Sequence, residues 1–361
     1  MTLEMFIQHL FNALALGALY GLIAIGYTMV YGILRLINFA HGDIFMLGAY
    51  LVFFSTVAFM PLWVALLICA CVVLVFYGAL FGWSKKSAAL PLALAGAFTV
   101  GALYCGFFAP GDFRPPWGVA VIFAIAVTSA CGILVDRAAY RPLRDAPRIS
   151  ALISAIGISF LIENLSVVLF SGLPRPVVQP EILATPIHVS LAGLTGNPES
   201  VVRIIPMALI VPVVAVLLVG MLLWIIYRTK PGLAMRSISK DIETTRLMGV
   251  SVNKVIALTF GLGSALAAAA GIMWALRYPQ IHPYMGILPG FKAFIAAVIG
   301  GIGSIQGAMI GGLMLGFIEI LVVAFYPTLS GYRDAFAFVL LIFILLCRPT
   351  GLLGEKLEDK I

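Results

Sequence analysis

The sequence predicts an all-α polytopic membrane protein, and its composition and its long apolar runs carry that prediction. Of the 361 residues, 62% are hydrophobic and only 10% are charged, whereas soluble domains have about 45–50% apolar and about 25% charged residues. A mean hydropathy of +1.12 leaves too little polar surface to cover a globule in water. This composition excludes a disordered scaffold, a disulfide-stapled secreted module and a nucleic-acid binder, despite the net charge of +7.

Apolar runs of the length that a spanning helix needs, about 20 residues, divide the chain into ten or eleven membrane segments within one domain, residues 1–361. The runs cover residues 6–31, 38–60, 62–83, 89–108, 116–135, 149–170, 204–227, 255–276, 288–306, 307–326 and 333–347. Glycines predict a broken helix near residues 32–43 and a second break near residues 300–307, where two segments can form a re-entrant pair.

The positions of Lys and Arg predict the orientation. The linkers after residues 135 and 227 hold ten of the 22 basic residues, so both are expected on the cytoplasmic side. Residues 171–203 then form an extracytoplasmic loop, in which the alternation at 187–191 allows a short strand or hairpin. The N-terminus falls outside and the C-terminus in the cytoplasm. The first helix has no basic segment before it, so we expect it to be retained.

The cytoplasmic loop of residues 228–254 contains Glu243-Thr244-Thr245 and, three residues later, Gly249. This pattern resembles the Glu-Ala-Ala, three residues, Gly coupling loop of ABC importer permeases, with Thr in place of both Ala. A short helix with small side chains can seat in a cleft of a partner ATPase, and the glycine supplies its C-terminal turn. The alternative is an ordinary basic loop that is helical. The candidate coupling residues are Arg236, Asp241, Glu243, Thr244, Thr245, Arg246 and Gly249.

Polar residues between two apolar segments mark a candidate substrate pathway at Asn38 to Asp43. A charge at the centre of a span costs about 2.5–3.5 kcal/mol on insertion scales, so such residues usually face a cavity or a partner. Free backbone groups of a broken helix could bind the ammonium and carboxylate of an amino acid near the middle of the membrane. The structural alternative pairs Arg35 with Asp43 and uses His41 to cap a helix.

Two further acids lie within apolar runs, and they can either line the pathway or hydrogen-bond across helices. Glu163 stands beside Asn164, and Glu319 lies in the tenth segment. The candidate pathway residues are therefore Asn38, Phe39, His41, Asp43, Glu163, Asn164 and Glu319.

Four stretches resemble the permease subunits of branched-chain (hydrophobic) amino-acid ABC importers, in particular the first of their two paralogous permeases. They are Tyr31 to Tyr50 with its Asn-Phe-Ala-His-Gly-Asp run, Tyr140 to Arg144, Thr259 to Ala265, and Phe291 to Gly316. The resemblance covers nearly the whole chain in order. Residues 62–115 depart from it as an inserted pair of transmembrane helices, which we interpret as a peripheral, lipid-facing pair.

The resemblance implies an importer subunit of the bacterial inner membrane that forms the translocation pathway by alternating access. Its implied partners are a paralogous permease, two cytoplasmic ABC ATPases, an extracytoplasmic substrate-binding protein and membrane lipid. The chain has no GxxxxGK[ST] motif of its own, so we expect it to bind no cofactor and the partner subunits to hydrolyse ATP. It is expected to be no enzyme and to bind no metal. The competing function is a stand-alone secondary transporter driven by protons through Asp43, Glu163 or Glu319.

Overall fold

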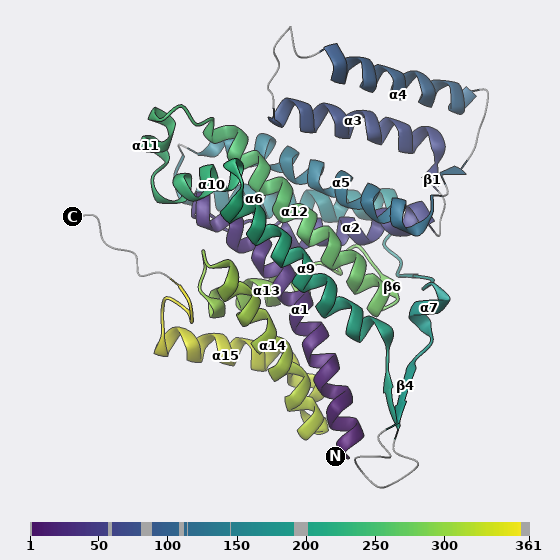
Figure 1. The fold of residues 1–361 in the computed structure, drawn as a ribbon, viewed down its shortest axis with the longest axis vertical. Helices are drawn as coiled ribbons and strands as arrows, with labels where there is room; N and C mark the ends of the chain where they lie inside the picture. Colours follow the sequence, from purple (N-terminus) through teal and green to yellow (C-terminus); the bar gives the residue numbers. More distant parts are fainter. Residues whose placement is uncertain are drawn as a thin grey trace.

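The structure, a computed structural model, describes residues 2–56, 60–80, 89–107, 112–113, 115–144, 146–190 and 201–354. Helices dominate these residues, which confirms the all-α polytopic class (Figure 1). The long helices are α1 (Leu3–Leu34), α2 (His41–Thr56), α3 (Leu62–Leu80), α4 (Ala89–Phe107), α5 (Trp117–Val135), α6 (Arg148–Phe170), α9 (Pro206–Arg228), α10 (Lys230–Lys240), α12 (Val252–Arg277), α13 (Ile287–Gly300), α14 (Ile305–Phe325) and α15 (Arg333–Cys347).

Short elements connect these helices. They are the helices α7 (Glu181–Ala184) and α11 (Ile242–Leu247), a π-helical turn (Asp136–Tyr140), two 3-10 turns (Arg141–Leu143 and Pro327–Tyr332), and the strands β1 (Met60–Pro61), β2 (Asp112–Phe113), β3 (Arg175–Pro176), β4 (Ile187–Ser190), β5 (Val201–Ile204) and β6 (Gln280–Ile281). The strands pair antiparallel as β1–β2, β3–β6 and β4–β5. The β4–β5 pair is the short hairpin expected in the loop of residues 171–203, of which 191–200 lie outside the described residues.

Every predicted apolar segment has a helix in the structure, but fewer helices than expected can span a membrane unaided. Among the described residues, eight stretches are long and apolar enough. The helices α2 and α13 have only 16 and 14 residues, and α4 offers the shorter apolar stretch Pro91–Cys105. The two predicted breaks account for the first two cases, because α1 ends at Leu34 before α2 begins, and α13 ends at Gly300 before α14 begins.

The helices α1 and α12 form the centre of the fold. α1 has 32 residues and is about 48 Å long at 1.5 Å per residue, so it exceeds the hydrocarbon thickness of about 30 Å. Its residues are buried on every side from Ala15 to Val30, and it packs against α9, α12, α13 and α14. A central helix without a polar face is what a span surrounded by other spans requires.

Glycines at four-residue spacing bring α1 and α14 into backbone contact. Gly312 lies against the backbone of Gly21, and Gly316 against that of Gly17. Small residues at such a crossing let two membrane helices approach closely. This contact between α1 and α14 is the most extensive between any two described elements.

The helices of the inserted segment, α3 and α4, lie at one end of the long axis of the molecule (Figure 1). α3 packs on α5, whereas α4 packs mainly on α3. Residues 81–88, 108–111 and 114 of this segment lie outside the described residues. α3 also contacts the central helix α12. The peripheral, lipid-facing role of the pair stays a prediction.

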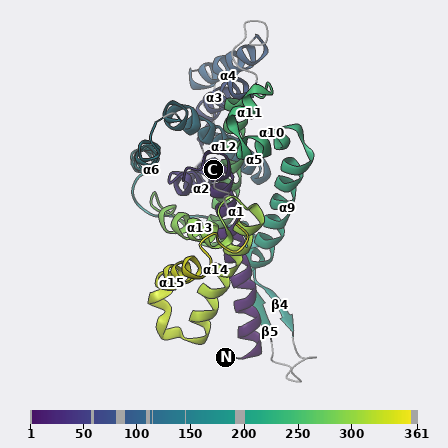
Figure 2. The ribbon, with the colours of Figure 1, turned by 90° about the vertical axis from the view of Figure 1, so that its left-hand side faces the viewer.

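The two ends of α1 define two ends of the molecule. The N-terminus lies beside the β4–β5 hairpin, and α10 and α11 lie beyond the opposite end of α1 (Figure 1). In the perpendicular view, α6 stands at one edge beside α2, while α9 occupies the other edge (Figure 2). α6 exposes most of its length and contacts α2 and the π-helical turn.

The segment after α15 closes the end of α13, and we call residues 348–354 the C-terminal strap. The backbone N–H of Leu352 donates to the carbonyl of Ile299 at 2.9 Å, and the N–H of Leu353 donates to that of Gly300 at 2.9 Å. These bonds satisfy carbonyls that a helix end otherwise leaves free. Gly301 has a φ of 104°, and a Cβ there would lie 2.3 Å from the nitrogen of Gly354, so this turn requires glycine.

Candidate functional site

The chain breaks between α1 and α2 at the segment that carries the predicted pathway residues. Arg35 ends α1 in the left-handed region with a φ of 52°, and its N–H donates to the carbonyl of Tyr31 at 2.7 Å. Asn38 is buried, and its side-chain oxygen accepts a hydrogen bond from the Tyr140 hydroxyl at 2.9 Å. The break is therefore held by the turn that follows α5, which contains the Tyr140 to Arg144 motif.

His41 is the first residue of α2 and lies inside the protein. Its ring makes an edge contact with Tyr27, with centroids 4.7 Å apart, and it crosses α1 at Gly26, where a Cβ would lie 2.1 Å from Nε2. Among the described residues, Nε2 has no hydrogen-bond partner. An unpartnered buried polar atom costs about 1–3 kcal/mol, so this nitrogen is a candidate for contact with substrate or water in another conformation.

Asp43 and Glu163 meet between α2 and α6. The Ser159 hydroxyl donates a hydrogen bond to the Asp43 carboxylate, and Glu163 lies one turn further along α6, where its carboxyl group adjoins that of Asp43. The predicted alternative of an Arg35–Asp43 pair is wrong, because Arg35 is exposed and no basic residue is paired with Asp43 among the described residues. Two neighbouring carboxyl groups without a cation repel each other when both are ionised, so the doubly charged pair has a high free-energy cost inside a membrane.

Aromatic side chains close the space beside this segment. The Phe39 ring lies 6.4 Å from that of Phe291 and 6.1 Å from that of Phe294, and Tyr27 lies 6.2 Å from Phe294. A cavity of about 10 Å³ remains between α1 and α13, with Tyr27, Tyr31 and Phe294 in its wall. Such a volume holds about one water molecule, so no amino acid passes here in this conformation.

The other two predicted pathway residues lie apart from this segment. The Asn164 amide donates to the carbonyl of Phe160 in its own helix at 2.7 Å and is exposed. Glu319 is buried and accepts hydrogen bonds from Tyr20 at 3.0 Å and from Lys292 at 2.9 Å. Its contacts run across helices, which is the second of the two roles considered for it.

Lys292 is one of the residues that the sequence analysis did not predict. It pairs with Glu319 at 2.9 Å and with Asp334 at 2.7 Å, and so joins α13, α14 and α15. The sequence did hold a signal, because Lys292 is a lone basic residue inside an apolar segment, and such residues normally have a partner. The partner is 27 residues away, beyond any helical spacing.

The predicted coupling loop contains a capped short helix, α11. Asp241 caps its N-terminus by accepting hydrogen bonds from the N–H groups of Glu243 and Thr244 at 3.0 and 3.2 Å. The Thr245 hydroxyl donates to the Asp241 carbonyl at 2.6 Å. These bonds fix the helix start as side-chain capping does generally. Arg236 is not on this helix, since it belongs to α10, where its guanidinium lies 5.3 Å from the Tyr227 ring centre.

The end of α11 presents a mixed polar and apolar tip. Gly249 follows the helix with a φ of 81°, which is the left-handed turn that favours glycine at a helix end. Leu247 and Met248 are 86% and 79% exposed, beside the exposed Glu243 and Arg246. The two apolar residues were missed from sequence, where they read as part of a basic loop, and they give a partner protein apolar surface to bury.

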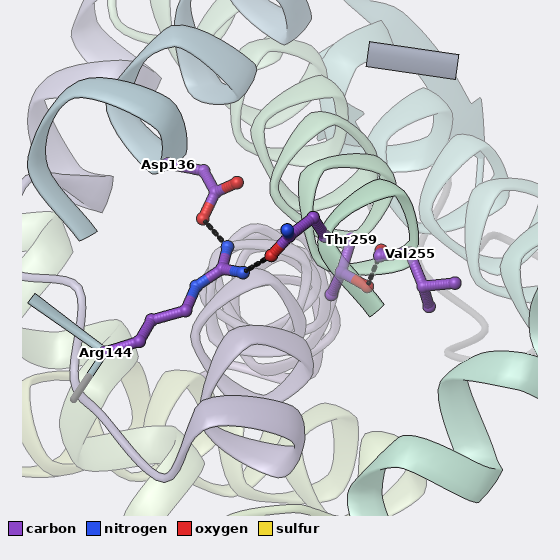
Figure 3. A network of polar contacts seen from close by, with 5 residues as sticks. Asp136, Arg144, Val255 and Thr259 are labelled. Carbon is purple, nitrogen blue, oxygen red and sulfur yellow. Dashed lines mark hydrogen bonds and ion pairs between the residues drawn. The ribbon is translucent and has the colours of Figure 1, made fainter. Parts of the chain in front are cut away.

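A polar network ties the start of α12 to the turn after α5 (Figure 3). Arg144 donates to the buried Asp136 at 2.6 Å and to Asn253 at 2.5 Å. Thr259 donates to the Val255 carbonyl at 2.9 Å within α12. Asn253 lies four residues after Gly249, so the coupling loop is joined to the same turn that holds Asn38.

No group of three or more His, Cys, Asp or Glu side chains that could hold a metal occurs in the part of the chain that the structure describes. The side chains gathered at the break between α1 and α2 offer hydrogen-bonding partners and apolar contacts.

Comparison with known proteins gives consistent matches over the whole chain. Residues 9–91 and 87–345 match the family described as the branched-chain amino acid transport system permease component. The high-affinity branched-chain amino acid transport system permease protein LivH of Escherichia coli (strain K12) is 38% identical over 357 residues, which cover 99% of this chain and 98% of the relative. BraD of Pseudomonas aeruginosa, described in the same words, is 38% identical over 358 residues, with the same coverage.

A more distant similarity extends to a permease that is named for a different substrate. The ribose import permease protein RbsC of Escherichia coli (strain K12) is 27% identical over 208 residues, which cover 56% of this chain and 60% of the relative. No solved structure matches the chain.

Proposed function

The chain belongs to the family of branched-chain amino acid transport system permease components, and on this basis we propose how its structure serves import. It is the transmembrane permease subunit of an ATP-binding-cassette importer for branched-chain or other hydrophobic amino acids, and a multi-pass protein of the inner membrane. The observation that carries this function is the 38% identity over 99% of the chain. The helical fold, with its eight spanning stretches, agrees with it.

We propose that the pathway runs past the break between α1 and α2. Asn38, His41 and Asp43 are supported as pathway residues by their burial at the break and by the unpartnered His41 nitrogen. Phe39 is supported by its ring contacts with Phe291 and Phe294. Glu163 joins them through Asp43. In this proposal the closed aromatic wall opens when the helices shift, so that the site faces one side of the membrane and then the other.

Coupling to ATP is proposed at the tip of α11. Two cytoplasmic ABC ATPases hydrolyse ATP, and one of them receives the α11 tip with Leu247 and Met248 in its cleft. A displacement of Gly249 then reaches the break through Asn253, Arg144 and the turn that holds Tyr140. Binding energy that differs between the two states drives the change of access.

The remaining partners and the orientation follow from the same proposal. A paralogous permease completes the pathway, and an extracytoplasmic substrate-binding protein delivers the amino acid. The N-terminus and the β4–β5 hairpin lie outside, and α10, α11 and the C-terminus lie in the cytoplasm. This orientation is supported by the basic residues of α10 and its flanks and by their separation from the N-terminus.

The stand-alone secondary transporter is the less favoured function, because the relatives are described as components of transport systems. Gentle extraction of the tagged chain from its native membrane, followed by mass spectrometry, separates the two. We expect an ATPase with a nucleotide-binding P-loop and a second hydrophobic permease to co-purify. Recovery of this chain alone, with proton-driven amino-acid uptake in liposomes, would overturn the proposal.

The coupling role has its own test. Glu243→Trp places a bulky ring on exposed α11, and it is expected to reduce ATPase co-purification at least tenfold while membrane insertion stays normal. The matched control is Glu181→Trp, which makes the same exchange at an exposed position of α7 in the outer loop. Full ATPase recovery with Glu243→Trp would refute the role of α11.

A further inference from the structure

A cavity at the C-terminal end of α1 lies outside the predicted pathway residues. It measures about 190 Å³, and its walls are Tyr31, Arg35, Leu36, Ile37, Ile149 and Leu152. The first four come from the end of α1 and the break, and the last two come from the start of α6. Apart from Arg35 and the Tyr31 hydroxyl the wall is apolar, and a dry cavity of about 150 Å³ takes up a molecule as large as benzene.

Arg35 gives this cavity a cation without a partner. It is exposed, and no hydrogen bond or ion pair of its side chain occurs with any residue that the structure describes. Its φ of 52° is a conformation that few residues other than glycine adopt. Residues held in such conformations concentrate at functional sites. A free guanidinium beside apolar walls matches a carboxylate that carries an aliphatic group.

The carbonyl groups at the C-terminal end of α1 add partial negative charge beside the positive charge of Arg35. Arg35 N–H bonds to Tyr31, but no backbone N–H among the described residues reaches the carbonyls of Gly32, Ile33 or Leu34. Free carbonyls at a helix C-terminus attract cations. These three residues stand between the wall residues Tyr31 and Arg35, so their carbonyls lie beside the cavity. Arg35 can pair with a carboxylate, the wall can hold an aliphatic group, and the neighbouring carbonyls can attract an ammonium group, which are the three parts of a hydrophobic amino acid.

The cavity also adjoins the closed pathway. It shares Tyr31 and Ile37 with the one-water cavity beside Tyr27, and Tyr27 contacts His41. The two cavities and the Tyr27 ring therefore form a line of contacts that runs from the buried His41, past Tyr31 and Ile37, to Arg35. It ends at the side of the molecule that holds α10 and α11, because the end of α1 packs against α10.

We infer that the Arg35 cavity is an exit site on the cytoplasmic side, where a hydrophobic L-amino acid is held by its carboxylate before release. This inference rests on the proposed function and adds a binding site to it. The side chains of Tyr31 and Ile37 separate the exit site from the interior in this conformation. Charge complementarity selects a free amino acid, since a ligand without a carboxylate leaves Arg35 unpaired.

Substrate protection of a cysteine in the cavity wall tests the inference. Inside-out vesicles from cells that produce the whole importer with Leu152→Cys are treated with N-ethylmaleimide, and mass spectrometry of the peptide that holds residue 152 measures its labelling. L-leucine is expected to slow labelling. Leucinamide, which lacks the carboxylate, and 4-methylpentanoate, which lacks the ammonium group, should each protect at concentrations at least about tenfold higher.

A second variant identifies the cation. Arg35→Gln added to Leu152→Cys should leave the labelling rate without ligand unchanged and raise the leucine concentration for half-protection at least about tenfold. Arg228→Gln, which removes another exposed arginine at the end of α9, should leave protection unchanged. Equal protection by leucine and leucinamide, or protection unaffected by Arg35→Gln, would overturn the exit site.

Lipid is the rival occupant, and the same assay detects it. If labelling falls with the phosphatidylglycerol content of reconstituted vesicles and does not respond to leucine, the cavity is a lipid site and the inference is wrong. Failure of the proposed function looks different, because the complex would then import no leucine at all. Import without carboxylate-dependent protection would reject the exit site alone.

Discussion

Replacing Gly312 by alanine is expected to push α1 and α14 apart. A Cβ at this position would lie 2.3 Å from the nitrogen of Gly21 and 2.5 Å from its Cα. Carbon atoms pack best at about 3.5–4.0 Å, so one helix has to retreat by about 1 Å. Both obstructing atoms belong to the backbone, and no side-chain rotation can relieve the overlap.

The cost follows from the size of this displacement. Overpacking a close-packed site costs about 1–3 kcal/mol, while alanine gains up to about 1 kcal/mol over glycine in helix propensity. Because the contact between α1 and α14 is the most extensive of the described fold, we expect an overpacking cost near the upper end of that range, about 3 kcal/mol. After the helix-propensity gain of about 1 kcal/mol, the net loss is about 2 kcal/mol. The loss should also reduce transport, since α1 carries Tyr27 and Arg35.

The assay is the unfolding midpoint of the purified chain in detergent, compared with that of a matched control. Gly220→Ala makes the same exchange in α9, where a Cβ would meet nothing within 4 Å. That variant should be neutral or stabilised by up to about 1 kcal/mol. If Gly312→Ala is as stable as Gly220→Ala, the close backbone contact does not exist and the reasoning fails.

Three further changes test other parts of the structure. Lys292→Met leaves Glu319 buried without its cation and should cost about 3–5 kcal/mol in unfolding free energy. Adding Glu319→Gln should recover part of this stability. If the double variant is as unstable as Lys292→Met alone, the pairing is contradicted. Gly249→Ala forces alanine to a φ of 81°, which costs about 1–2 kcal/mol of backbone strain. We expect this strain to lower ATP-dependent uptake per inserted chain. Unchanged uptake would show that coupling does not need the turn at Gly249. Tyr140→Phe deprives Asn38 of its donor and should cost about 1–3 kcal/mol, measured as the unfolding midpoint; a variant as stable as the wild type would mean that the bond does not hold the break.

The fold could be predicted well where apolar length alone decides it. The run at residues 6–31 became α1, Leu3–Leu34, and the run at 204–227 became α9, Pro206–Arg228. The prediction was poorer at residues 38–60, because polar residues of the break delay the start of α2 to His41. The length of an apolar run predicts where a membrane helix can lie. It does not predict where a helix breaks, because the breaks depend on local polar and glycine residues.

The candidate site was predicted only in part, because its contacts join distant segments. Asn38 and Tyr140 lie 102 residues apart, and Ser159 and Asp43 lie 116 apart. The sequence marked Asn38 and Asp43 as polar residues between apolar segments. It held no signal that Tyr140 and Ser159 would be their partners. Glu319 illustrates the limit, since its cation on α13 could be found only in the folded structure.

The C-terminal strap has a consequence for biogenesis. Leu352 and Leu353 cap the end of α13, yet they follow α14 and α15 in the chain, so the carbonyls of Ile299 and Gly300 stay free until both later helices have been made. The strap therefore locks the end of α13 only after α14 and α15 have been made. A chain truncated before residue 348 would leave the turn at Gly301 open and expose it to quality-control proteases.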